Sequence, residues 1–115
     1  MARILISEPH ELVRRLLERM LMRIGHEPFV VTMPTLPRVL DADLFIVEPA
    51  APVGIMLVQA VHIANPSLSM ICASVYGPPG ELHELGVVFA DCLIKPFTLD
   101  QLQAAIELAL HVQSV

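Results

Sequence analysis

The stretch Asp43-Leu44-Phe45-Ile46-Val47-Glu48-Pro49 decides the fold of this chain. Its four consecutive apolar residues are typical of a strand that is buried on both faces, as in a parallel sheet with helices on each side. The run ends in a carboxylate and a proline, so Glu48 is expected at the carboxyl end of a central strand. Ligands bind outside those ends in open α/β sheets. Glu48 is therefore a candidate functional residue, although a strand-end acid can also simply mark where a strand reaches solvent.

Composition limits the classes of protein that the sequence can encode. The chain has 115 residues, enough for a single domain over residues 1–115 with one hydrophobic core. Hydrophobic residues make up 55% of the chain and charged residues 17%, above and below the ordinary averages for globular proteins. Apolar surface is therefore expected to remain once the core is filled, which favours a protein partner.

Several other classes are disfavoured. The net charge of −5 argues against direct nucleic-acid binding, and four arginines between positions 14 and 23 are interpreted as a solvated helix face. No apolar run approaches the ~18 residues of a membrane span, and a strand starting at Arg3 leaves no room for a signal peptide, so we expect a cytoplasmic protein with no membrane partner. Cys72 and Cys92 lie inside apolar runs and are interpreted as small buried hydrophobic residues.

Strands and helices are predicted to alternate along the whole chain. The expected strands are 3–7, 29–32, 43–48, 68–73 and 91–94. The expected helices are 13–24, 53–64, 81–85 and one that follows the capping box of Thr98 and Gln101, with only a short or irregular helix in the proline-containing segment 33–40. This alternation predicts right-handed crossovers and a doubly wound, five-stranded parallel sheet of the flavodoxin-like order 2-1-3-4-5, with helices on both faces.

Two of these helices are expected to leave apolar side chains facing away from the sheet. On a helical wheel, Ile55 and Val58 fall opposite the side assigned to the sheet, which carries Val53, Met56, Leu57, Ala60 and Ala64. In the last helix, Ala104 and Leu108 lie opposite the core stripe. Because leftover apolar faces usually mark contact sites, Ile55, Val58, Ala104 and Leu108 are the predicted interaction surface.

Polar residues follow the apolar runs at four strand ends, namely Glu8, Glu48, Ser74 and Lys95-Pro96-Phe97. In this combination, and in the order of its elements from Arg3 to about His111, the sequence resembles the receiver domain of two-component response regulators. That family has an acidic pair after its first strand and a phosphoryl-accepting Asp at the end of its third. A Ser or Thr ends the fourth strand and Lys-Pro ends the fifth. The resemblance implies that the protein acts in signal transduction.

The sequence departs from the family pattern at three positions. Pro9 stands where the family has the second acid of the pair that holds magnesium, and a proline ring offers no ligand. Glu48 stands at the position of the phosphorylated Asp, and its additional methylene spoils the in-line geometry for attack on a donor phosphate. The aromatic switch position of the family falls on Cys92. Phosphoryl transfer is therefore expected to be lost, and no metal or other cofactor is predicted.

Lys95 and Ser74 keep the residue types of the family. In its active state these two positions contact the phosphoryl oxygens, so here they are expected to contact the Glu48 carboxylate in a permanently active-like arrangement. Lys95 is the only lysine of the chain. The pairing of Glu48 with Lys95 is favoured over a merely solvated lysine, because a partly buried cluster of acids needs a cation.

The function predicted from these residues is an atypical receiver domain, a pseudo-receiver that acts as a phosphorylation-independent interaction module and not as an enzyme. Its partners are expected to be proteins, including a second copy of the chain. The five histidines show no ligand spacing, and no catalytic triad order is visible. Two alternatives remain open: a conventional phosphoacceptor served by a histidine kinase, and a sensor that binds a small ligand in the crevice where the family holds its metal.

Overall fold

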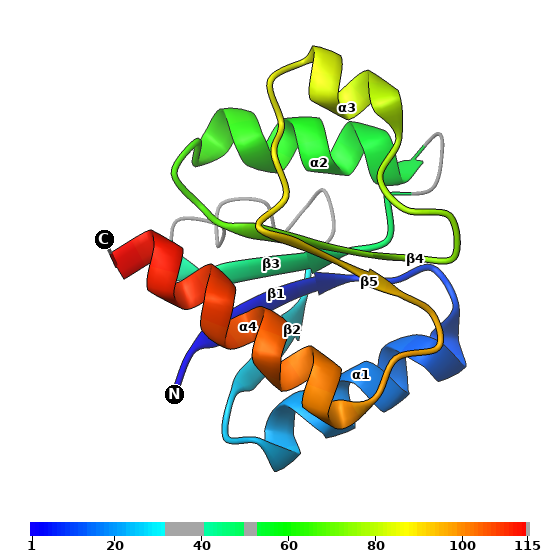
Figure 1. Cartoon of the computed structure of the whole chain (residues 1–115), viewed down its shortest axis with the longest axis vertical. Coiled ribbons are helices and arrows are strands. Elements are labelled where there is room, and N and C mark those ends of the chain that lie inside the picture. The colour runs from blue at the N-terminus through cyan, green and yellow to red at the C-terminus, as the bar shows by residue number, and fades with distance from the viewer. Residues whose placement is uncertain (32–40, 50–52, 115) are drawn as a thin grey trace.

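A computed structural model of the chain describes residues 1–31, 41–49 and 53–114. The elements in chain order are β1 (Arg3–Ser7), α1 (Glu11–Arg23), β2 (Glu27–Val30), β3 (Leu44–Val47), α2 (Val53–Ala64), β4 (Met70–Ser74), α3 (Gly80–Glu84), β5 (Asp91–Ile94) and α4 (Leu99–Ser114). They stack in three layers, with the sheet between two pairs of helices (Figure 1). The predicted short or irregular helix of 33–40 lies outside the described residues. None of the helices in the described ranges is both long and apolar enough to cross a membrane.

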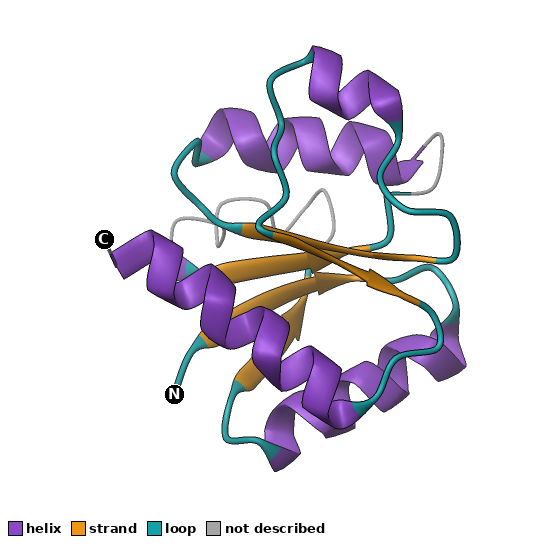
Figure 2. Ribbon diagram, in the orientation of Figure 1, coloured by secondary structure: helices purple, strands orange, loops and turns teal. Residues whose placement is uncertain are grey.

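All five strands are parallel and lie in the order β2-β1-β3-β4-β5. The sheet has α2 and α3 on one face and α1 and α4 on the other, as the purple helices above and below the orange strands of Figure 2 show. The predicted fold class is confirmed. Because the strands are parallel, their carboxyl ends all lie at the same end of the sheet. There β1 and β3 are neighbours, and β3 and β5 both flank β4.

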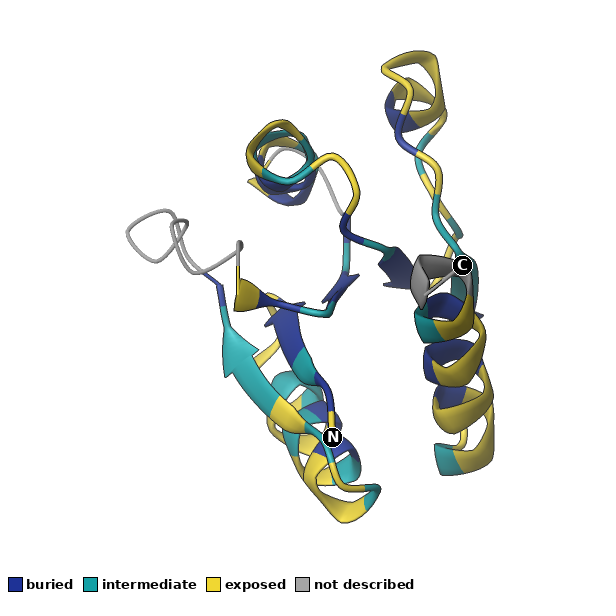
Figure 3. Cartoon of the chain, turned by 90° about the vertical axis from the view of Figure 1, so that its left-hand side faces the viewer, coloured by how far each residue is buried: buried dark blue, intermediate teal, exposed yellow. Residues whose placement is uncertain are grey.

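Each face of the sheet carries its own apolar cluster, because successive side chains of a strand point to opposite faces. Ile4, Ile6 and Ile46 pack against α1 and α4, whereas Leu5 and Phe45 pack against α2 and α3. All four residues of β3 are buried, as predicted for a central strand. Figure 3 shows buried residues on the strands and on the inward sides of the helices. The strands thus form the centre of the apolar interior, with one cluster on each face of the sheet.

Two strands begin at other residues than predicted. β2 covers Glu27–Val30 instead of 29–32, because Glu27 pairs with Arg3 at the start of β1. Its Pro28 is tolerated because β2 lies at the edge of the sheet. β4 covers Met70–Ser74 instead of 68–73, and its ladder with β5 runs as far as the pair Ser74 and Ile94. In both cases the neighbouring strand sets the register, which the strand's own sequence does not encode.

The rotation of α2 was predicted wrongly. Val58 is 0% exposed, packed in the core cluster on the α2 and α3 side, and Ile55 is partly buried against that cluster. Val53 and Met56, which were expected to face the sheet, are 70% and 58% exposed. The helix is apolar nearly all round, so its sequence pattern does not determine which side turns inward. Val58 therefore does not belong to an interaction surface, and Ile55 contributes little to one.

The last helix agrees with its predicted pattern, and the first agrees in part, because Leu16 of its apolar stripe is 57% exposed. In α1, Leu17 and Leu21 are buried, while Arg14 and Arg15 form ion pairs with Glu11 on the outer side. The capping box of α4 is present: the Thr98 hydroxyl oxygen accepts from the Gln101 backbone N–H at 3.1 Å, and the Gln101 side-chain oxygen accepts from the Thr98 N–H at 2.8 Å. Ala104 and Leu108 are exposed on the outer side of α4, as predicted.

Candidate functional site

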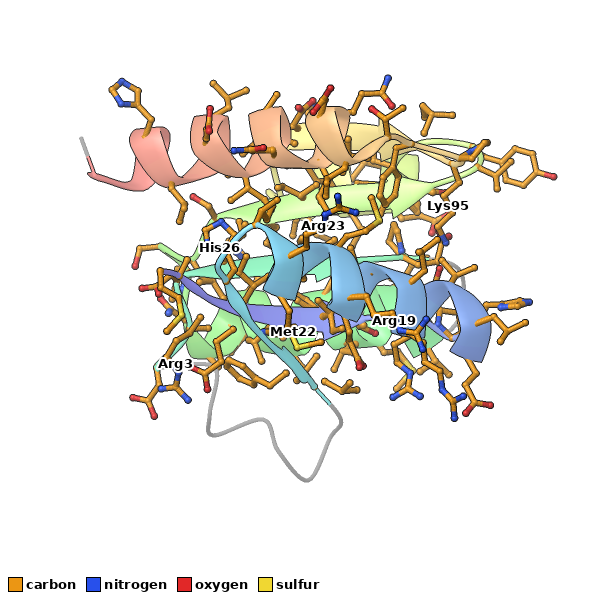
Figure 4. The ribbon with its side chains drawn as sticks, turned by 90° about the horizontal axis from the view of Figure 1, so that it is seen from below. Arg3, Arg19, Met22, Arg23, His26 and Lys95 are labelled. Carbon is orange, nitrogen blue, oxygen red and sulfur yellow. The ribbon has the colours of Figure 1, made fainter. Side chains whose placement is uncertain are left out.

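The candidate site lies at the carboxyl ends of β1, β3 and β5. Glu8 directly follows β1, Glu48 directly follows β3, and Lys95 directly follows β5. Since the three strands are parallel members of one sheet, the turns that leave them bring these side chains together. Figure 4 shows Lys95 at the opposite end of the molecule from Arg3 and His26, which lie near the start of the sheet.

The Lys95 ammonium group is shared between the two carboxylates. Its Nζ donates a hydrogen bond to Oε1 of Glu8 and lies 3.0 Å from Oε2 of Glu48. The three side chains are largely withdrawn from solvent, with exposed fractions of 4% for Glu8, 13% for Glu48 and 19% for Lys95. The expected contact between Glu48 and Lys95 is therefore present, and Glu8 completes a triad of two acids and one base.

The triad has one more negative charge than positive charge. Burial by itself would lower the pKa of Lys95, but its contacts with Glu8 and Glu48 outweigh burial and raise the pKa above the ordinary value of lysine. Lys95 is thus held in its charged form. Within the described residues, Oε2 of Glu8 and Oε2 of Glu48 are buried without an aligned hydrogen-bond donor. The 3.0 Å approach of Lys95 to Glu48 is therefore an ion pair more than a directed hydrogen bond.

Ser74 lies near the triad but does not join it. The residue is 4% exposed and ends β4, next to β3 and β5. Its hydroxyl oxygen accepts a hydrogen bond from the Tyr76 backbone N–H at 3.2 Å. The expected hydrogen bond from Ser74 to Glu48 does not form among the described residues. The hydroxyl instead holds the turn that follows β4.

The residues present do not fit a magnesium site. Magnesium is bound by carboxylate oxygens in near-octahedral geometry, with water and phosphate completing the shell. Pro9 is exposed and has no oxygen in its side chain, and the Lys95 ammonium stands between the two remaining carboxylates. In the part of the chain that the structure describes, no three His, Cys, Asp or Glu side chains are grouped so that they could hold a metal ion. The cation of this cluster is a lysine.

Gly54 positions Glu48, a role that the sequence analysis did not predict. A Cβ atom at Gly54 would come within 2.6 Å of the Glu48 carbonyl oxygen and within 2.9 Å of the Pro49 backbone. The first turn of α2 therefore packs directly on the backbone that leaves β3, and only glycine allows this approach. The side of α2 that meets the end of β3 therefore carries Gly54, while Val53 and Met56 are exposed. A glycine in the first turn of an otherwise apolar helix was the available signal.

Two open cavities adjoin this region. One, of about 360 Å³, is lined by Glu48, Ser74, Tyr76 and Glu81 together with the glycine and prolines of the intervening loops. The other, of about 320 Å³, lies between α3 and β5 and is lined in part by Cys92, the predicted switch position. Cys92 is partly buried in β5. The first cavity has Glu48 of the triad in its lining, whereas none of the three triad residues lines the second.

The fold is that of response-regulator receiver domains, and the comparisons with solved structures agree. A CheY-like receiver domain protein from Methanospirillum hungatei has a TM-score of 0.81 at 19% identity, with 99% of this chain and 97% of that chain covered. A sensor protein from Polaromonas has a TM-score of 0.82 at 24% identity, covering 97% and 98%.

A third structure is the receiver domain of a sensor histidine kinase from Pseudomonas aeruginosa, with a TM-score of 0.79 at 19% identity and coverage of 96% and 98%. That structure has a magnesium ion coordinated in its active site cleft. No protein-family model matches the sequence, and no curated protein matches it either. The likeness to all three structures lies in the fold.

Proposed function

We propose that this chain is an atypical receiver domain of two-component signalling that works as a phosphorylation-independent interaction module. The receiver fold and the strand-end positions of Glu8, Glu48 and Lys95 support the placement in signalling. Its partners are proteins rather than nucleic acid, and its place is the cytoplasm. One observation carries the proposal: the Lys95 ammonium is already paired with both carboxylates that would otherwise hold a metal.

The arrangement of Glu48 argues against its acting as a phosphoacceptor. A carboxylate that attacks a donor phosphate needs a free oxygen in line with the leaving group and a metal to offset the charge of the transferred group. Oε2 of Glu48 is buried 3.0 Å from Lys95, and Pro9 supplies no metal ligand. Lys95 therefore supplies to the two carboxylates the positive charge that a magnesium ion would otherwise supply.

Intact-mass spectrometry after incubation with acetyl phosphate and Mg²⁺ tests the proposal. We expect no increase in mass for the natural sequence. The matched control is the double variant Pro9→Asp, Glu48→Asp, which restores both missing groups while Lys95 stays in place. We expect it to gain one phosphoryl group, and either single variant to gain far less, because neither completes the site. A phosphoryl group mapped to Glu48 in the natural sequence would support a conventional phosphoacceptor.

The partner surface that we propose is the outer side of α4. Leu108 is 49% exposed there, with Ala104 exposed one turn before it. A second copy of this chain is the proposed occupant. Light scattering of the natural sequence is expected to give the mass of a dimer, and Leu108→Glu that of a monomer. The matched control is Leu12→Glu, at an exposed apolar position on α1, which should leave the dimer intact. If Leu108→Glu were also a dimer, the interface would lie elsewhere.

The cavity of about 360 Å³ beside Glu48 supports a second candidate function, a sensor for a small ligand. Glu48 and Glu81 line it, so a small organic cation is the favoured class of ligand. A ligand that binds only the folded state raises the melting temperature. A panel of small amines should then stabilise the natural protein and stabilise Glu81→Gln less. Equal melting temperatures with and without every amine would remove this candidate.

A further inference from the structure

The two cysteines of the chain face each other across neighbouring strands. Cys72 of β4 is the register partner of Cys92 of β5. Burial raises the pKa of the Cys72 thiol, and the neighbouring Cys92 side chain adds to that rise. The residues that follow the two cysteines, Ala73 and Leu93, belong to the cluster on the α1 and α4 face of the sheet. Because side chains alternate along a strand, both thiols point to the other face, beneath α3. A pair with this placement was not expected from two isolated apolar runs.

The spacing of the strands brings the pair within reach of a covalent bond. Neighbouring strands lie about 4.8 Å apart, and the Cα atoms of a disulfide are usually about 4.4–6.8 Å apart. Side chains directly opposed in a parallel pair have Cβ atoms near the strand spacing, slightly beyond the preferred range of a disulfide. A bond between Cys72 and Cys92 is therefore attainable with some strain, and strained disulfides are the ones that are readily reduced.

The two thiols differ in access. Cys92 is partly buried and lines the cavity of about 320 Å³ between α3 and β5, together with Leu82, Val87 and Phe89. Cys72 is 0% exposed, and burial raises the pKa of its thiol. A small oxidant can thus reach Cys92 through the cavity, while Cys72 is protected behind it. One accessible thiol beside one protected thiol is the arrangement of a reacting cysteine and its resolving partner.

We propose that Cys72 and Cys92 form a peroxide-sensitive thiol pair that closes reversibly into a disulfide between β4 and β5. In the first step the Cys92 sulfur attacks one oxygen of hydrogen peroxide, the O–O bond breaks, and Cys92 becomes a sulfenic acid with release of water. In the second step the Cys72 sulfur attacks the Cys92 sulfur, which expels a second water. Two thiols and one peroxide thus give one disulfide and two waters, and a dithiol reductant reverses the reaction.

The position of the pair links its redox state to the strand-end triad. Cys72 precedes Ser74 by two residues on β4, and Cys92 precedes Lys95 by three on β5. Burial raises the pKa of the Cys72 thiol, the charge of Glu48 raises it further, and the charge of Lys95 opposes the rise. A covalent bond that draws β4 and β5 together at this register changes the relative placement of Ser74 and Lys95. Oxidation should therefore be visible at the triad, whether or not the chain is a signalling module.

The test uses the natural protein in its folded state. The reduced chain is treated with a small excess of hydrogen peroxide, unfolded in the presence of an alkylating reagent, and weighed intact. We expect a product that has lost two hydrogen atoms and takes up no alkylating reagent, a peptide that joins Cys72 to Cys92, and full reversal by a dithiol. The amide NMR signals of Ser74 and Lys95 should shift on oxidation, while that of His26, at the other end of the sheet, should not.

Single variants separate the roles of the two thiols. Cys72→Ala should leave Cys92 as a sulfenic acid that a dimedone reagent captures, whereas Cys92→Ala should leave Cys72 unoxidised in the folded state. Three results would overturn the proposal: peroxide-treated natural protein that still takes up two equivalents of alkylating reagent, a disulfide between two chains instead of within one, or an internal disulfide that forms only in denaturant.

Discussion

The interior of the sheet and the carboxyl ends of its strands are held by different kinds of interaction. In β3, Phe45 and its neighbours are enclosed by apolar side chains on both faces. Glu48, the residue directly after β3, has a side chain that is only 13% exposed, and its negative charge is balanced by a single cation that it shares with Glu8. Apolar packing is non-directional and favours the fold under most conditions, whereas a partly buried ion cluster is sensitive to the loss of any one charge. The apolar interior can therefore hold the fold when a charge at the strand ends is lost.

The largest expected effect is in the interior. Phe45→Ala removes the largest fully buried side chain, and we expect a loss of about 3–5 kcal/mol in the free energy of unfolding. Urea unfolding followed by circular dichroism measures it. Phe45→Leu is the matched control, because it keeps most of the apolar volume and should cost less than about 1.5 kcal/mol. Similar losses for both variants would show that packing at this position is not what holds the centre of the sheet.

A smaller effect is expected at the strand ends, and it depends on pH. Lys95→Met leaves Glu8 and Glu48 without their cation, which should cost about 1–3 kcal/mol at neutral pH. In acid, where carboxylates are protonated, the cost should shrink. Arg15→Met is the control, because Arg15 pairs with Glu11 with its side chain 60% exposed and should change stability by less than about 1 kcal/mol. Equal losses for Lys95→Met in acid and at neutral pH would contradict the pairing.

The effect of Lys95→Met on stability at alkaline pH follows from the raised pKa of Lys95. Its contribution to stability is fully present below 10.5, the ordinary pKa of lysine, and is lost as the pH rises through the higher value of the folded state. The difference in unfolding free energy between the natural protein and Lys95→Met should therefore narrow above pH 10.5 as well.

The junction between the two regions is tested at Gly54. Gly54→Ala places a Cβ atom 2.6 Å from the carbonyl oxygen of Glu48, so α2 must shift at a cost of about 1–2 kcal/mol. Gly80→Ala is matched to it, since nothing lies within 4 Å of its added Cβ atom and the change should stay within about 0.5 kcal/mol. Thermal unfolding of the two variants decides the point. If both were neutral, the close packing of α2 on the end of β3 would not be a constraint.

The smallest effect is expected at the opposite end of the sheet. Nδ1 of His26 accepts a hydrogen bond from the Ala2 backbone N–H at 3.1 Å, and burial together with the N-terminal charge lowers the pKa of His26 below 6.5. The stability from the neutral imidazole is thus complete above 6.5 and declines as the pH falls toward the lower folded value. His26→Asn keeps an acceptor without a titration, so the natural protein should lose stability relative to it on acidification. Parallel pH dependences would refute this assignment.

The sequence predicted those features that a local pattern encodes. The buried run of β3, the capping box of Thr98 and Gln101, and the polar residues at four of the strand ends all depend on neighbours in the chain, and the structure has them. The start of β2 and the rotation of α2 were wrong because contacts with other elements decide them. The sharing of Lys95 by Glu8 and Glu48 was foreseeable from topology, whereas the opposed thiols of Cys72 and Cys92 required the register of two strands.

The central claim is that the Lys95 ammonium stands in place of a metal at the ends of β1 and β3. Titration of Mg²⁺ into isotopically labelled protein, followed by the amide NMR signals of Glu8, Glu48 and Lys95, tests it most directly. We predict no saturable shift for the natural sequence through the millimolar range, and a saturable shift for the double variant Pro9→Asp, Glu48→Asp. A saturable shift of the Glu8 and Glu48 signals in the natural sequence would contradict the account, because it would mean that magnesium displaces the lysine from its two carboxylates.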